Sequence, residues 1–139
     1  MAQPTTIKDC MRRHPLTIHR DASLVHAVEI ILENRLTGLT VTDDEGQVVG
    51  ILSELDCIGA TLAAIYNEGD PAHTLVGDAM TAATEFCKPN DSIVEVAQSM
   101  LEHQQRRRPV IENGKLVGQV SSSNILWALI EHSRSKINR

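Results

Sequence analysis

The sequence contains an internal repeat with a nearly constant offset. Segments of the first half recur in the second with an offset of 69 residues early in the repeat (76 − 7 = 69) and 68 residues later (118 − 50 = 68). One residue is therefore lost in between, in the turn that follows Asp43. Such a repeat means that one small structural unit occurs twice. The matched pairs are Ile7–Met11 with Val76–Met80, Ser23-Leu24 with Ser92-Ile93, and Val48–Gly50 with Leu116–Gly118.

Each repeat shows the same order of elements, β-α-β-β-α. Short apolar or β-branched runs predict strands, and Asp/Gly-rich turns between two of them predict a hairpin. Apolar residues three and four apart after a Ser predict helices with a Ser cap. The expected elements of the first repeat are Leu16–His19, a helix after Ser23, the hairpin Thr40–Leu52 and a helix from Ser53. Those of the second are Glu85–Lys88, Ser92–His103, the hairpin Pro109–Val120 and Ser122–His132.

These elements divide the chain into residues 7–66, a linker at 67–75, and residues 76–134. The fold class is therefore α/β (α+β). A three-stranded sheet with two helices covers only one of its faces well, so one repeat leaves apolar surface unburied. We expect the two repeats to pack as one globule with approximate internal two-fold symmetry.

Composition excludes several classes of function. The formal net charge of −5 argues against general nucleic-acid binding. The chain has no apolar run long enough for a membrane span and no apolar signal-peptide core, so we expect a cytoplasmic protein without membrane partners. Three widely spaced cysteines without a CxxC pair favour buried thiols, and the six histidines lack metal-ligand spacing, so no metal site is expected.

The motifs resemble those of the CBS (cystathionine beta-synthase) domain family over nearly the whole chain. The marks are the Asp-x-Met opening, the Ser-Leu-x-x-Ala helix start, and Val49–Asp56, which is similar to the family motif G-h-x-[ST]-x-x-D. Gly118–Asn124 is a weaker second copy. The resemblance implies a stand-alone tandem CBS pair: a regulatory, energy-sensing module without catalysis or a required cofactor. It also implies a homodimer and an unidentified regulated partner.

The resemblance further implies that AMP, ADP or ATP, with S-adenosylmethionine as another possibility, binds in a cleft between the repeats. An Asp carboxylate can accept hydrogen bonds from both ribose hydroxyls, and paired guanidinium groups suit phosphates. A Ser-x-x-Asp sequence at a helix start also fits a capping box, which would use both side chains for the backbone alone. Carried over onto this chain, the nucleotide site comprises Ile51, Ser53, Asp56, Phe86, Arg106 and Arg107.

A second, weaker site is expected from the pseudo-symmetry. Here Asn124 replaces the ribose-binding Asp, and Thr37-Gly38 stands in the first repeat where Arg106-Arg107 stands in the second. We expect this site to be empty or to take a less charged ligand. Its residues are Leu16, Thr17, Thr37, Gly38, Ser121, Ser123 and Asn124.

Two other functions compete with a ligand sensor. A CBS pair without ligand could serve only as an interaction or dimerisation protein, with Trp127 either in the core or on the dimer surface. An enzyme is not expected, because no Ser/His/Asp set, phosphate-binding loop or metal constellation stands out in the sequence.

Overall fold

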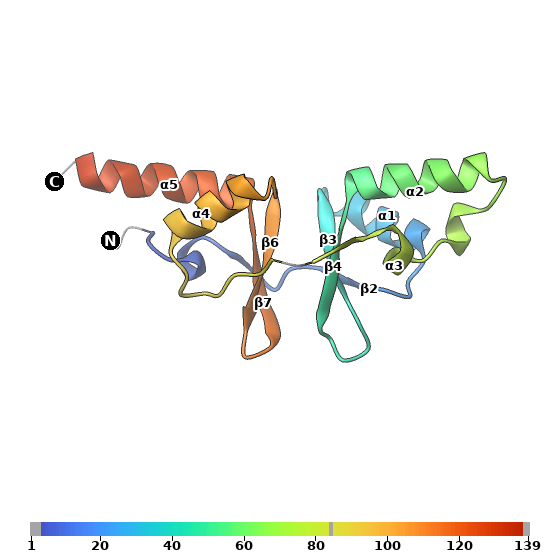
Figure 1. The fold of residues 1–139 in the computed structure, drawn as a ribbon, viewed down its shortest axis with the longest axis horizontal. Helices are drawn as coiled ribbons and strands as arrows, with labels where there is room; N and C mark the ends of the chain where they lie inside the picture. Colours follow the sequence, from blue (N-terminus) through green and yellow to red (C-terminus); the bar gives the residue numbers. More distant parts are fainter. Residues whose placement is uncertain (1–3, 84, 138–139) are drawn as a thin grey trace. The chain divides into compact units, whose positions relative to one another are not determined.

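The computed structural model describes residues 4–83 and 85–137, and it confirms the α/β class. The chain forms two compact units, each with strands and helices (Figure 1). We call residues 16–83 the central unit, and residues 4–15 with 85–137 the terminal unit. Each repeat contributes its opening segment to the unit that is otherwise formed by the other repeat. The boundaries of the units therefore differ from those of the sequence repeats.

The central unit contains a four-stranded sheet in the order β2-β3-β4-β5. Strands β2 and β3 are parallel, whereas β3, β4 and β5 are antiparallel. Its strands are β2 (Thr17–His19), β3 (Gly38–Thr42), β4 (Val48–Ser53) and β5 (Thr81–Ala82). Its helices are α1 (Leu24–Glu33), α2 (Glu54–Tyr66) and the short α3 (Val76–Ala79), with a 3-10 turn at Pro71–His73.

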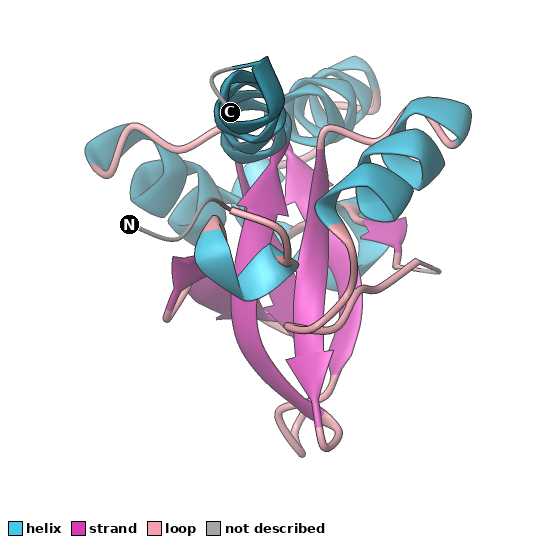
Figure 2. Cartoon of the chain, turned by 90° about the vertical axis from the view of Figure 1, so that its left-hand side faces the viewer, coloured by secondary structure: helices cyan, strands magenta, loops and turns pink. Residues whose placement is uncertain are grey.

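The terminal unit contains a three-stranded antiparallel sheet in the order β1-β7-β6. The strands are β1 (Arg12–Arg13), β6 (Arg107–Glu112) and β7 (Lys115–Ser121), and the helices are α4 (Ile93–Glu102) and α5 (Ser122–Ile137). A 3-10 turn, Ile7–Asp9, precedes β1. Figure 2 shows the long β-hairpins together with the helices.

The opening segment of each repeat is held by matching backbone hydrogen bonds. In the central unit, Leu24 N donates to Thr74 O (2.8 Å) and Val76 N donates to Ala22 O (2.9 Å). In the terminal unit, Ile93 N donates to Thr5 O (3.1 Å) and Ile7 N donates to Asp91 O (3.0 Å). The bonds at Leu24 and Ile93 satisfy amide groups in the first helical turn, which have no partner within their own helix.

Each unit has its own hydrophobic core between its helices and one face of its sheet. Leu39 and Leu52 lie in the central core, and Val110 and Val120 lie in the terminal core. Because side chains alternate across a strand, the neighbouring residues project from the opposite face. We call this opposite face the helix-free face, because the helices of each unit lie on the other side of its sheet (Figure 1).

Two predicted elements differ from the structure. The strand expected at Glu85–Lys88 is reduced to a single parallel bridge between Cys87 and Val110. Pro89, which lacks an amide hydrogen, follows and cannot extend the ladder as a donor. Helix α5 extends to Ile137 rather than ending at His132. None of the described helices is both long and apolar enough to cross a membrane.

A pair of equivalent glycines permits the short edge strands to lie close to the hairpins. A Cβ on Gly50 would lie 2.8 Å from Thr81 O and would also meet Met80 Sδ, and one on Gly118 would lie 2.9 Å from Arg12 O. Gly59, on the exposed side of α2, would meet nothing within 4 Å.

We therefore expect Gly50→Ala to lower the free energy of unfolding by about 1–3 kcal/mol, as overpacking does. The matched control, Gly59→Ala, should raise it by about 0.5–1 kcal/mol, because Ala is the better helix former. Urea denaturation of both variants measures the difference, and equal stabilities would contradict the close approach of β5.

Candidate functional site

The end of strand β4 and the start of helix α2 form a reciprocal capping box. Ser53 N donates to Asp56 Oδ2 (3.0 Å), and Asp56 N donates to Ser53 Oγ (3.0 Å). Both residues are half-buried. The capping alternative raised by the sequence is therefore confirmed as a structural role. It leaves the hydroxyl hydrogen of Ser53 and further lone pairs of the carboxylate available for other partners.

Thr81, which sequence reasoning missed, is a second partner of the Asp56 carboxylate. Its hydroxyl donates to Asp56 at 3.3 Å from Oδ1 and 3.4 Å from Oδ2. Thr81 lies on β5 and is paired in register with Ile51. No local sequence signal identifies Thr81, because its segment opens the second repeat but completes the sheet of the first.

The other predicted residues of the central unit lie close to this box. Ile51 and Ser53 are on β4, where Gly38 is the register partner of Ser53, and Thr37 O accepts a bond from Glu54 N (3.1 Å). Thr17 opens β2 and is the register partner of Thr40, next to the exposed Leu16. The helix-free face of this sheet thus carries most of the candidate residues of the central unit.

The terminal unit repeats the capping box with an amide in place of the carboxylate. Ser121 N donates to Asn124 Oδ1 (3.0 Å), and Asn124 N donates to Ser121 Oγ (3.2 Å). Only the amide oxygen can accept from Ser121 N, which fixes the orientation of the Asn124 side chain. Ser123 is exposed in the first turn of α5.

The three consecutive arginines at the start of β6, Arg106 just before it and Arg107 and Arg108 within it, have different environments. Arg108 is 3% exposed and donates to Ser99 Oγ (3.1 Å) and to Gln105 Oε1, so it is a structural residue. Arg107 is the register partner of Ser121 and projects on the other side of the strand from Arg108. Arg106 is exposed, and its carbonyl accepts a bond from Ser122 N (2.8 Å).

Phe86 is 42% exposed and lies one residue before the bridge between Cys87 and Val110. An exposed aromatic ring is available to stack on a planar group. Each of the two predicted sites takes residues from both units, so the joint assembly of either site stays a prediction.

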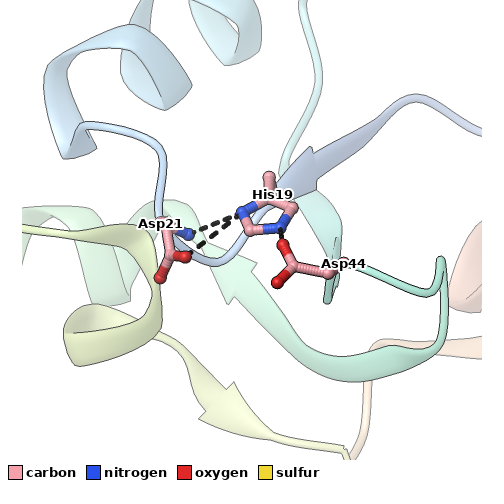
Figure 3. Close-up of side chains that lie close together, drawn as sticks. All are labelled: His19, Asp21 and Asp44. Atoms are coloured by element: carbon pink, nitrogen blue, oxygen red, sulfur yellow. Dashed lines mark hydrogen bonds and ion pairs between the residues drawn. The ribbon is translucent and has the colours of Figure 1, made fainter.

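One cluster contains residue types that could hold a metal ion. His19, Asp21 and Asp44 place one ligand atom each within 4.8 Å of one another (Figure 3). Asp21 N donates to His19 Nδ1 (3.0 Å), so Nε2 carries the proton that faces Asp44 Oδ1 at 2.7 Å. Both ring nitrogens are thus engaged within the protein, and the cluster links the turn after β2 to the β3–β4 hairpin.

The cysteines fit the interpretation as small hydrophobic residues. Cys57 and Cys87 are buried, and Cys10 is half-buried. Burial raises the pKa of the Cys87 thiol to about 12, and it also raises the pKa of Cys10 and of Cys57. At neutral pH the protonated thiols are poor nucleophiles.

Comparison with known proteins reveals similarity over most of the chain. Hypoxic response protein 1 of Mycobacterium tuberculosis is 30% identical over 129 residues, covering 93% of this chain and 88% of that protein. Human 5'-AMP-activated protein kinase subunit gamma-3 is 33% identical over 116 residues, covering 78% of this chain and 23% of that protein. The chain spans about half the length of the first curated relatives it matches, 42% of one and 56% of another.

Among solved structures, that of CBSX2 in complex with AMP superposes with a TM-score of 0.79 at 26% identity, covering 98% of this chain and 100% of that one. The solved structure of Hypoxic Response Protein I has two coordinated zinc ions. It superposes with a TM-score of 0.75 at 27% identity, covering 88% of this chain and 98% of that one. The family model of the CBS domain matches residues 7–63 and again residues 76–131. The chain therefore belongs to the CBS-domain family and contains two copies of the domain.

Proposed function

We propose that this chain is a non-catalytic regulatory module that binds an adenine nucleotide, of the AMP, ADP or ATP class, and transmits the bound state to a partner protein. CBSX2, which was solved with AMP, supports the ligand class, and the gamma subunit of the AMP-activated kinase supports a regulatory role. The proposed nucleotide site uses Ile51, Ser53 and Asp56 of the central unit with Phe86, Arg106 and Arg107 of the terminal unit.

The observation that carries this proposal is the spare acceptor capacity of Asp56. An ionised carboxylate offers about four lone-pair positions. The capping box uses one for Ser53 N–H, and the Thr81 hydroxyl uses another. Two acceptor positions remain, which matches the two hydroxyl donors of a ribose. Capping and ligand binding are therefore compatible in one side chain.

Asp56→Asn separates these two roles. The amide oxygen can still accept from Ser53 N, so we expect the free energy of unfolding to change by less than about 0.5 kcal/mol. The charged acceptor is lost, so AMP affinity should fall about ten- to a hundredfold, since such bonds contribute roughly 1.5–3 kcal/mol. Asp56→Ala should lose both the capping bond and the ligand contact. Calorimetric titration measures the AMP affinity of each variant, and thermal unfolding measures its stability.

Ser53→Ala serves as a reference for stability alone, because Ser53 itself belongs to the proposed site. The variant removes the cap and should cost about 1 kcal/mol of stability. If wild type binds AMP and Asp56→Asn binds it equally well, Asp56 is only a cap. Absence of binding to any adenine nucleotide at millimolar concentration would favour a ligand-free dimerisation protein.

We also propose that the chain forms a homodimer through α2 and α5. Leu55, Ile58, Leu62 and Ile65 recur three and four residues apart along α2 and are 48–70% exposed. Their spacing forms one apolar stripe, which is the pattern of a helix that pairs with another. Helix α5 repeats its middle part, with Leu126 and Ile130 at the equivalent positions (58 + 68 = 126; 62 + 68 = 130) and with the exposed Trp127 beside them.

Replacement of both Ile58 and Leu62 by Glu should convert the dimer to a monomer, because two charges would have to be buried in the apolar interface. Light scattering at micromolar concentration gives the mass, and circular dichroism verifies that the variant folds. A monomeric wild type, with and without nucleotide, would contradict the dimer.

A further inference from the structure

The position equivalent to Thr81 in the terminal unit is Arg12 (81 − 12 = 69). The two positions have the same pairing: Thr81 lies opposite Ile51 on β4, and Arg12 lies opposite Gln119 on β7 (51 + 68 = 119). Asn124 corresponds to Asp56 in the same way (56 + 68 = 124). Arg12 and Asn124 thus occupy in the terminal unit the positions at which Thr81 and Asp56 meet in the central unit, where the Thr81 hydroxyl lies 3.3 Å from the Asp56 carboxylate.

The side chains of the two capping boxes differ in the group that the box leaves unused, which is an acceptor in one unit and a donor in the other. In the central unit the second carboxylate oxygen of Asp56 is an acceptor, and a hydroxyl donor faces it. In the terminal unit the box uses Oδ1 of Asn124, so its remaining group is the NH2, which only donates. The guanidinium of Arg12 also only donates and carries a full positive charge.

No carboxylate neutralises Arg12 in the terminal unit. Arg12 is exposed and forms no ion pair within residues 4–83 and 85–137. Its side chain projects on the helix-free face, because its register partner Gln119 alternates with Gly118 and Val120, and Val120 lies in the core. Arg13, with the same charge and also exposed, projects on the opposite side of β1.

We propose that Arg12 and the side-chain amide of Asn124 form an anion-binding site of the terminal unit, which takes a phosphate group. A site made only of donors, one of them a guanidinium, matches phosphate oxygens and does not match a ribose diol. The weaker site expected from the sequence contains no cation, because the residues that correspond to Arg106 and Arg107 are Thr37 and Gly38. The structure provides the cation from the opening segment of the chain.

The test uses the full chain carrying Asp56→Asn, so that the proposed ribose contact cannot contribute, and calorimetric titration with pyrophosphate, AMP and adenosine. Adding Arg12→Gln should weaken pyrophosphate or AMP binding by about tenfold, the size expected for one charge-assisted contact. Arg13→Gln, the matched control, should change it less than about twofold, because Arg13 projects on the opposite side of β1 and its exposed charge is screened by salt. Adenosine binding should not respond to either change.

Asn124→Asp gives an independent test. It preserves the capping box, as Asp56 does in the central unit, but its carboxylate pairs with Arg12 and repels phosphate. Stability should be unchanged and anion binding lost. Arg12-dependent binding of AMP alone would support the site and identify a nucleotide phosphate as its ligand, whereas binding of pyrophosphate as well would show that phosphate alone suffices.

Equal effects of Arg12→Gln and Arg13→Gln would overturn the site. So would the absence of pyrophosphate and AMP binding up to about 10 mM, a concentration that would reveal even millimolar affinity. The nucleotide function is judged separately, on AMP binding to the chain with Asp56 intact, so either proposal can fail without the other.

Discussion

The backbone bonds between the opening segment of one repeat and the first helix of the other are the constraint on which the rest of the structure depends. Helices α1 and α4 begin with amide groups that no residue of their own helix can satisfy. Thr74 O supplies the partner for Leu24 N, and Thr5 O supplies it for Ile93 N. This exchange of opening segments between the repeats also places Val76 and Ile7, both fully buried, in the cores of the two units. Neither repeat can complete its core without a segment of the other.

This exchange also determines which side chains surround each strand-to-helix junction. Strand β5 places Thr81 against Asp56, and β1 places Arg12 at the equivalent register position of the terminal unit. Such close approach of the edge strands requires Gly50 and Gly118, because a Cβ at either position would meet the backbone of the edge strand. The two glycines therefore allow the edge strands, and with them Thr81 and Arg12, to take these positions.

The sequence alone was sufficient for the elements that depend on local patterns. Ser23, Ser53 and Ser92 cap helices as expected, and both hairpins lie where β-branched runs flank turns. It was not sufficient for the exchange of segments, since the repeat offset does not tell which copy an opening segment joins. For this reason Thr81 and Arg12 were missed, whereas Asp56 and Asn124 followed from the motif. The burial of Arg108 among Ser99 and Gln105 was equally hidden within a run of three arginines.

The two strand-to-helix junctions differ at two equivalent positions, and the two differences belong together. An arginine in place of Thr81 would pair with the Asp56 carboxylate and remove the acceptor on which the proposed ribose contact depends. By the same reasoning, an aspartate in place of Asn124 would oppose the anion site proposed for Arg12 and Asn124. Each junction therefore keeps its own hydrogen-bonding and charged groups only with its own pair of residues, Asp56 with Thr81 or Asn124 with Arg12. Because both pairs retain the capping box, the duplicated fold presents two different sets of hydrogen-bonding groups without loss of the hydrogen bonds that start α2 and α5.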